Sequence, residues 1–214
     1  VSGLFVVLAA AGVGAGMPNR DASGEDVVSL HRRLERRQLG VVLEQHRVAG
    51  QGKAPDELVD AYCRVSNGNA AALDQCQALA ALFEQARIPF VVLKGLAVLL
   101  QLYGIRGTRP LSDVDLLVHE ADLETIDRIL TEADYARQID GNPCYASPGN
   151  GLAFDLVTTL WYLDEQGLAE LWANARPHVL HARTLLLPAA DDLLIHLTAY
   201  AVIHRGALTP AWEQ

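Results

Sequence analysis

Hydrophobic and polar residues are distributed differently in the two parts of the chain. In residues 27–48 and 56–87, leucines and valines recur at helical spacing among charged side chains, which predicts two helices. The stretch Ser-Asn-Gly-Asn at 66–69 predicts a break in the second of them, because glycine and asparagine favour turns. From residue 90 onward the apolar residues form short continuous runs, which are typical of buried strands.

The second part of the chain alternates strand and helix patterns. Strands are expected at 90–93, 114–118, 135–139, 152–158 and 178–186. Helices are expected at 96–103, 121–133, 168–174 and 191–204, with loops at 104–112 and 140–151. Helices that are followed by a β–α–β order and further strands predict an α+β fold with a mixed β-sheet.

The chain divides into four predicted regions. Residues 1–16 are apolar and uncharged, and we interpret them as a leader or as an over-extended start, since Met17 is the only methionine and a polar stretch follows it. A signal peptide and an ordinary buried segment are the other interpretations of this stretch. The further regions are a helical N-terminal region at 17–88, an α+β core at 89–188 and a truncated C-terminal helix at 189–214.

Charge and cysteine content narrow the classes of partner. The 214 residues include 17 basic and 26 acidic side chains, a net charge of -9, and 13 of the acids lie between 110 and 170. A protein with this excess of acidic residues lacks the positively charged surface that binds nucleic acid or anionic lipid. Neither nucleic acid nor a membrane is therefore an expected partner. The three cysteines form no disulfide framework and are predicted to be buried free thiols of a cytoplasmic protein: Cys63, Cys76 and Cys144.

Asp113 and Asp115 stand two positions apart at the start of an apolar strand. Alternate residues of a strand point to the same face, which puts these two side chains about 6–7 Å apart. Two negative charges at such a distance are costly unless a cation lies between them. Mg²⁺ (or Mn²⁺) suits the pair, because it takes hard oxygen ligands and completes its shell with waters and phosphate oxygens.

Two further features give this pair of aspartates a context. Lys94 and Gly95 follow a predicted strand and open a helix, which places backbone N–H groups where a phosphate can dock. Asp155 is a single acid within the apolar strand at 152–158. A third carboxylate of this kind would complete a two-metal site and act on an attacking hydroxyl.

The combined pattern resembles the uncharacterised nucleotidyltransferases of the polymerase-beta-like superfamily. The matching segments are Leu-Lys-Gly at 93–95, the arginine and the Asp-Val-Asp-Leu-Leu-Val strand within 109–118, and Phe-Asp-Leu at 154–156. The resemblance implies a polymerase-beta-like fold with a nucleotidyltransferase core at 89–188. It also implies transfer of a nucleoside monophosphate from an NTP, ATP included, to an acceptor hydroxyl, with release of pyrophosphate.

The resemblance assigns roles to individual residues. Asp113 and Asp115 would ligate the Mg²⁺ or Mn²⁺ that holds the triphosphate, and Asp155 would ligate a second metal ion and help to activate the acceptor. The acidic balance favours a small molecule or a protein side chain as the acceptor over a nucleic acid. Nucleotide binding would fall to Lys94, Gly95, Arg109 and Ser112.

Several alternatives stay open. Leu96 stands where the wider superfamily has a serine in the turn, which leaves room for a degenerate or truncated protein that binds nucleotide or regulates a partner. A hydrolase that uses the same acids and releases free phosphate is a third class. His196 and His204 share one face of a predicted helix, where packed histidines are favoured over metal ligands. Core packing is also favoured over base stacking for Trp161, Tyr162 and Trp172.

Overall fold

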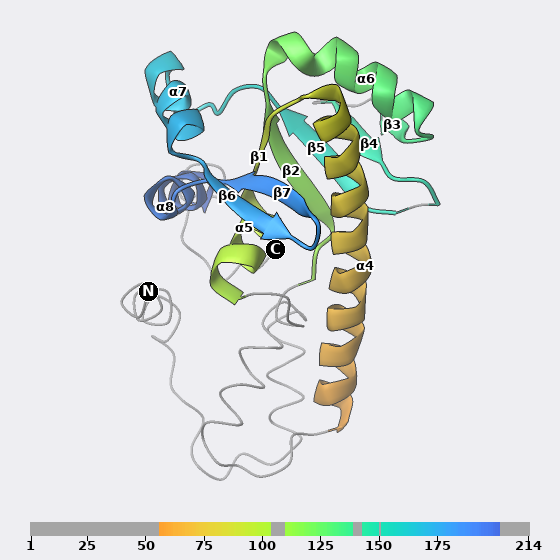
Figure 1. Cartoon of the computed structure of the whole chain (residues 1–214). Helices are drawn as coiled ribbons and strands as arrows, with labels where there is room; N and C mark the ends of the chain where they lie inside the picture. Colours follow the sequence, from red (N-terminus) through yellow and green to blue (C-terminus); the bar gives the residue numbers. More distant parts are fainter. Residues whose placement is uncertain (1–55, 104–109, 139–142, 150, 202–214) are drawn as a thin grey trace.

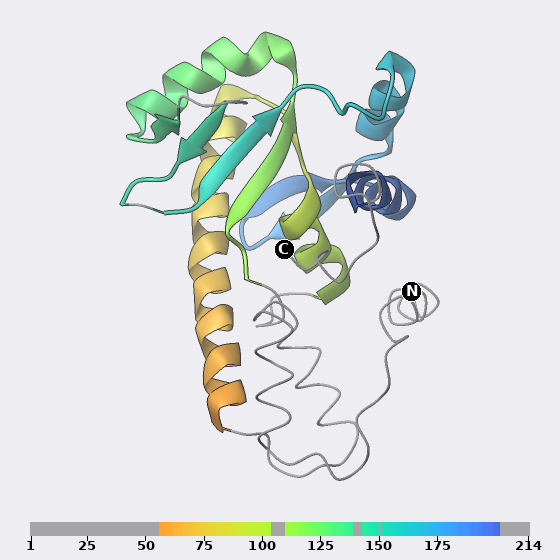
Figure 2. The same cartoon turned by 180° about the vertical axis from the view of Figure 1, so that it is seen from behind.

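The computed structural model describes residues 56–103, 110–138, 143–149 and 151–201 (Figures 1 and 2). One long helix runs alongside a mixed sheet, and shorter helices lie around the sheet. The elements up to the second strand are α4 Asp56–Ala86, β1 Phe90–Val92, α5 Lys94–Val98, the π-helix η1 Leu99–Tyr103 and β2 Asp113–Val118. The remaining elements are the 3-10 helix η2 Glu120–Asp122, α6 Leu123–Glu132, β3 Ala136–Gln138, β4 Cys144–Ala146, β5 Ala153–Val157, α7 Glu165–Asn174, β6 Arg176–Leu180, β7 Arg183–Leu187 and α8 Ala190–Ala199.

The described strands form one seven-stranded sheet in the order β3-β4-β5-β2-β1-β7-β6. The central strand β2 is antiparallel to β1 and parallel to β5. The outer pairs β3–β4 and β6–β7 are antiparallel hairpins. The mixed sheet confirms the predicted α+β class, and it places the strand with the paired aspartates at the middle of the sheet.

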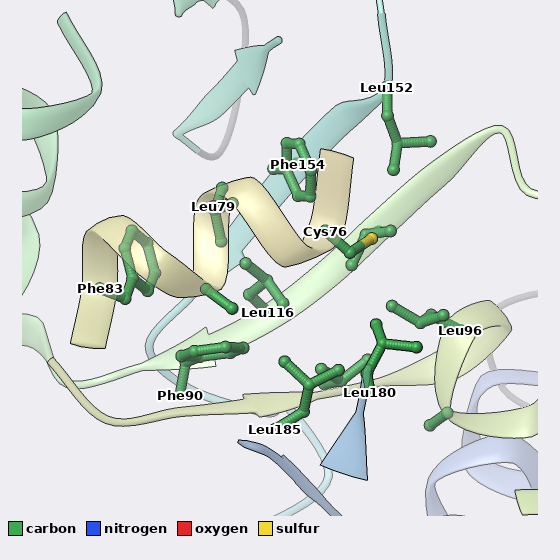
Figure 3. Packing of buried hydrophobic residues seen from close by; sticks show 14 of the residues in the cluster. Cys76, Leu79, Phe83, Phe90, Leu96, Leu116, Leu152, Phe154, Leu180 and Leu185 are labelled. Atoms are coloured by element: carbon green, nitrogen blue, oxygen red, sulfur yellow. The ribbon is translucent and has the colours of Figure 1, made fainter. Parts of the chain in front are cut away.

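The two faces of the sheet are covered by different helices. Along β2, Val114, Leu116 and Val118 alternate with residues of the opposite face and pack into the larger hydrophobic cluster. Figure 3 shows how the α4 side chains cover this first face, with Phe83 and Leu79 lying over the strands. The second face carries a smaller cluster that α7 covers, made of Val91, Leu93, Leu117, Leu160 and Leu171.

Helix α4 is continuous from Asp56 to Ala86, so the predicted break at 66–69 is wrong. Asn69 is only 1% exposed and sits on the same buried face as Ala72 and Leu73. A glycine in a helix interior costs about 1 kcal/mol relative to alanine, and burial of the neighbouring apolar face exceeds that cost. Gly68 is exposed, and among the described residues outside its own turn of the helix no atom lies within 4 Å of the place where a Cβ would stand.

The other helices and strands predicted for the described residues agree with the structure, except for two strand assignments, and the burial of one cysteine also differs from the prediction. The predicted loop at 140–151 contains β4, because this short segment pairs with β5. The single strand predicted at 178–186 is a hairpin of β6 and β7, with a turn at His181 whose φ is 52°. Cys63 is exposed rather than buried, whereas the other two cysteines are buried as predicted. The helix predicted at 27–48 lies outside the described residues.

No helix among the described residues combines the length and the apolar character that crossing a membrane requires.

Candidate active site

The three predicted carboxylates lie on one face of the sheet. Strands β2 and β5 run in parallel, and their register pairs Asp115 with Asp155 and Asp113 with Ala153. Asp113 and Asp115 share a face of β2 because they are two residues apart. That face is opposite to the one that packs on α4, since Val114 and Leu116 belong to the α4 side. Two acids from segments forty residues apart in the sequence are therefore direct neighbours.

The three carboxylates differ in burial. Asp113 is exposed and Asp155 is half-buried, while Asp115 is only 6% exposed. Burial raises the pKa of the Asp115 carboxyl, the nearby ammonium of Lys94 opposes that shift, and the charges of Asp113 and Asp155 add to it. A buried carboxylate requires a partner of opposite charge. Lys94 is that partner, because its Nζ forms an ion pair and a hydrogen bond with Oδ1 of Asp115.

Lys94 reaches Asp115 from the first position of α5, just after β1. Its φ of 43° lies in the left-handed region, which a residue with a side chain rarely adopts and which often marks functional turns. Its Nζ also lies 4.5 Å from the centroid of the Tyr200 ring, at the end of α8. Burial acts to lower the pKa of Lys94, but the charge of Asp115 and the hydrogen bond to it, together with the nearby Tyr200 and Asp113, outweigh that effect and the pKa is raised. The ammonium thus stays charged inside an acidic site.

Cys144 extends the row of polar groups to a third strand. In the β4–β5 register Cys144 is the partner of Asp155, so both side chains lie on the same face. Burial and a hydrogen bond from the thiol to the Asp155 carboxylate raise the pKa of Cys144 to about 12. The thiol therefore stays protonated, and it is not a nucleophile. Sequence reasoning treated Cys144 only as a buried thiol, because its pairing with Asp155 depends on the sheet register.

The other predicted nucleotide-binding residues have different surroundings. Ser112 is exposed, and its hydroxyl donates a 2.8 Å hydrogen bond to Oδ1 of Asp113. Gly95 is half-buried and is the second residue of α5, directly after Lys94. Arg109 lies outside the described residues. Ser112 therefore contacts the carboxylate of Asp113, whereas Gly95 is only next to Lys94 along the chain.

A buried polar group on α8 adjoins this site. His196 is 2% exposed, and its Nδ1 lies 2.7 Å from the Tyr162 hydroxyl. Burial, and to a lesser extent the charge of Lys94, lowers the pKa of His196 to about 4. This histidine is packed, as predicted, whereas His204 lies outside the described residues. The expectation of core packing is wrong for Trp161, whose side chain is 56% exposed.

The comparisons with known proteins agree with this geometry. The profile of the uncharacterised nucleotidyltransferase family matches residues 27–210, which is most of the chain. The chain belongs to this family. The predicted family, and with it the prediction of a nucleotidyltransferase, is confirmed at that level.

Two crystal structures resemble this family member in fold. One is a protein of Thermotoga maritima that is provisionally assigned as a nucleotidyltransferase, with 14% identity, a TM-score of 0.50, and coverage of 63% of this chain and 87% of that one. The other is an antigenic nucleotidyltransferase-like protein of Paracoccidioides brasiliensis, with 16% identity, a TM-score of 0.51, and coverage of 67% and 72%. No curated protein matches the chain. At these identities the two structures establish the nucleotidyltransferase fold and nothing finer.

The donor set of this nucleotidyltransferase-family chain suits a divalent cation in chemistry and in strand position. Three carboxylates on one sheet face are the oxygen ligands that Mg²⁺ prefers. In the part of the chain that the structure describes, however, no three His, Cys, Asp or Glu side chains are gathered closely enough to hold a metal ion. In the structure the ammonium of Lys94 is bound to Asp115, the buried member of the three.

Helix α4 holds the backbone of both carboxylate strands through two polar side chains. Oδ1 of Asn69 accepts a 3.0 Å hydrogen bond from the backbone N–H of Leu111, two residues before Asp113. Oε1 of Gln75 accepts from the hydroxyl of Ser147 and from the N–H of Leu152, the residue before β5. Helix α4 is thus hydrogen-bonded to the segments that lead into both carboxylate strands.

Replacing Asn69 by alanine is expected to disturb the start of β2. Leu111 would keep a partly buried N–H without this acceptor, so the free energy of unfolding should fall by about 1–2 kcal/mol. We expect the nucleotidyl-transfer rate at saturating nucleotide to fall as well, because Asp113 follows this loop. Asn67→Ala, which removes an exposed asparagine of the same helix, is the matched control and should leave both quantities unchanged. Urea unfolding and initial rates measure the two effects, and equal behaviour of the two variants would contradict the interpretation.

Proposed function

We propose that this chain is a metal-dependent nucleotidyltransferase that moves a nucleoside monophosphate from an NTP to an acceptor hydroxyl and releases pyrophosphate. The observation that carries the proposal is the pairing of Asp115 with Asp155 across parallel strands, with Asp113 on the same face. When bound, divalent metal ions would align the triphosphate, neutralise its charge and lower the pKa of the acceptor hydroxyl.

Each residue of the proposed site would have a role that fits its surroundings. Asp113 and Asp115 would hold the metal that carries the triphosphate, and Ser112 would keep the exposed carboxylate of Asp113 oriented. Asp155 would hold a second metal and accept the proton of the acceptor hydroxyl. The thiol of Cys144 would keep the carboxylate of Asp155 in place by donating to it.

Phosphate binding and acceptor choice are the less defined parts of the proposal. Lys94 and Gly95 lie at the turn where the triphosphate would pass, and Arg109 is a further candidate for phosphate contact. The net charge of -9 favours a small molecule or a protein as the acceptor over a nucleic acid, and it fits a cytoplasmic protein that uses ATP or another NTP.

A second function is favoured by one specific observation. Because the ammonium of Lys94 occupies Asp115, the chain could bind nucleotide without turning it over and act as a regulatory partner. Metal-dependent NTP binding that is never followed by transfer would support this second function.

The decisive experiment incubates the full chain with each of the four NTPs labelled at the α-phosphate, Mg²⁺ or Mn²⁺, and cell extract as the source of acceptor. Transfer is expected to put the label on an acceptor and to release pyrophosphate in equal amount. Release of free phosphate would instead identify a hydrolase. Label transfer that survives both Asp113→Ala and Asp155→Ala would disprove the site assignment.

A further inference from the structure

The cation inside the candidate site is a lysine, a residue that is rare in this chain. Of the 17 basic residues, 15 are arginines and only Lys53 and Lys94 are lysines. Arginine binds carboxylates through a rigid two-pronged contact, whereas lysine presents a compact point charge on a flexible stem. A lysine at this position can therefore exchange partners with less geometric constraint than an arginine could.

Lys94 is held at the site from several directions. Its ammonium is bound to Asp115, which the chain buries, and it faces the ring of Tyr200. Its backbone is in the left-handed region, so the turn that aims the side chain is an uncommon one. Between described residues, no other salt bridge involves Asp113, Asp115 or Asp155. Within that part of the chain, Lys94 is thus the cation that neutralises the buried member of the three acids.

We propose that Lys94 is an internal counter-ion that occupies the metal position of Asp115 until a metal–nucleotide complex binds. A divalent cation and an ammonium group cannot share the buried carboxylate without strong mutual repulsion. Free metal alone therefore competes with Lys94 and binds weakly. An arriving triphosphate offers Lys94 new anionic partners, so the ammonium moves to the phosphates and releases Asp115 to the metal.

This inference rests on the proposed function, and it adds a rule for how the site is filled. The metal and the nucleotide would bind together, and neither Mg²⁺ nor Mn²⁺ would be retained between turnovers. Such coupling would keep the buried acid neutralised and the site closed to stray cations when no nucleotide is present. The opposite arrangement is a fixed ion pair that only supports the fold, and it predicts no competition between Lys94 and metal.

The first test measures Mn²⁺ binding to the full chain without nucleotide, by calorimetry or by the electron paramagnetic resonance signal of free Mn²⁺. Lys94→Met is expected to bind Mn²⁺ about tenfold or more tightly than the unaltered chain, because the competing charge is gone. Lys94→Arg keeps that charge and should stay weak. Arg183→Met is the matched control for net charge, since Arg183 pairs with the exposed Glu84. Equal Mn²⁺ affinity of Lys94→Met and the unaltered chain would overturn the inference.

The second test needs no variant and decides the matter even if Lys94→Met does not fold. The chain has only two lysines, so an amine-reactive reagent and mass spectrometry report Lys94 against Lys53 as the internal reference. Saturating Mn²⁺ is expected to raise the labelling of Lys94 relative to Lys53. Addition of a non-hydrolysable NTP with the metal should lower it again, as phosphates cover the ammonium. Labelling of Lys94 that stays unchanged at saturating Mn²⁺ would overturn the inference.

The two proposals fail in different ways. If neither the unaltered chain nor Lys94→Met binds Mn²⁺, with or without the non-hydrolysable NTP, the metal-dependent function itself is wrong. If the unaltered chain binds Mn²⁺ without nucleotide as tightly as with it, the metal site stands and only the role of Lys94 is wrong.

Discussion

Replacing Asp155 by asparagine is expected to reduce nucleotidyl transfer by about 1,000-fold or more, because a metal ligand and a proton acceptor are lost together. The fold should be nearly unaffected. Asp155 is half-buried and has no ion pair with Lys94, and an asparagine oxygen can still accept from the thiol of Cys144. The initial rate of label incorporation measures the first effect, and the thermal midpoint measures the second.

The matched control is Asp74→Asn, which removes an exposed carboxylate on α4. It should transfer the label at the rate of the unaltered chain. Asp115→Asn would be a less specific test, because it also breaks the buried pair with Lys94 and therefore alters stability. If Asp155→Asn kept more than about one tenth of the activity, Asp155 would be neither a metal ligand nor the base.

The largest expected effect on stability is a loss at acidic pH, which results from protonation of His196. The pKa of His196 is about 4 in the folded chain and 6.5 as the ordinary value, so the unfolded chain binds this proton more readily. The stabilisation from the neutral ring is complete above pH 6.5, and it is lost progressively as the pH falls from 6.5 towards 4. Between pH 7 and pH 5 this one group should lower the free energy of unfolding by about 2 kcal/mol.

Urea unfolding at pH 7, 6 and 5 measures this loss, and His196→Asn isolates the contribution of the histidine. Asparagine cannot titrate in this range, yet it offers an acceptor to the Tyr162 hydroxyl. The loss in the free energy of unfolding between pH 7 and pH 5 should therefore be smaller by about 2 kcal/mol in this variant. His181→Asn is the control, because His181 is exposed at a turn with φ of 52°, a conformation that asparagine tolerates. A slope in His196→Asn as steep as in the control would show that His196 does not titrate with unfolding.

The local pattern of residues was sufficient to predict the central strand and its acids. Strand alternation puts Asp113 and Asp115 on one face whatever the rest of the sheet does, and the apolar run that follows them predicts burial. The amphipathic pattern also predicted α6, whose apolar residues pack into the larger hydrophobic cluster. These features depend on periodicity within a few residues, which a single sequence records directly.

Features that depend on pairing between distant segments were missed or misplaced. Strand β4 has three residues and no periodic pattern, and it exists because β5 supplies its hydrogen bonds. The predicted break in α4 failed for a related reason. Asn69, read as a turn residue, is buried in the helix and accepts from Leu111, so its polar group serves another segment. Local propensity gives way wherever tertiary contacts satisfy the same groups.

The sequence by itself determined the family, the α+β class and the identity of the candidate acids, because each follows from short motifs and their spacing. Only the tertiary structure decided which groups meet. The parallel register of β2 and β5 makes Asp115 and Asp155 neighbours, and the turn after β1 brings Lys94 onto Asp115. The physical reason is that a buried carboxylate must be neutralised, and the choice of its partner depends on the three-dimensional path of the chain and not on distance along the sequence.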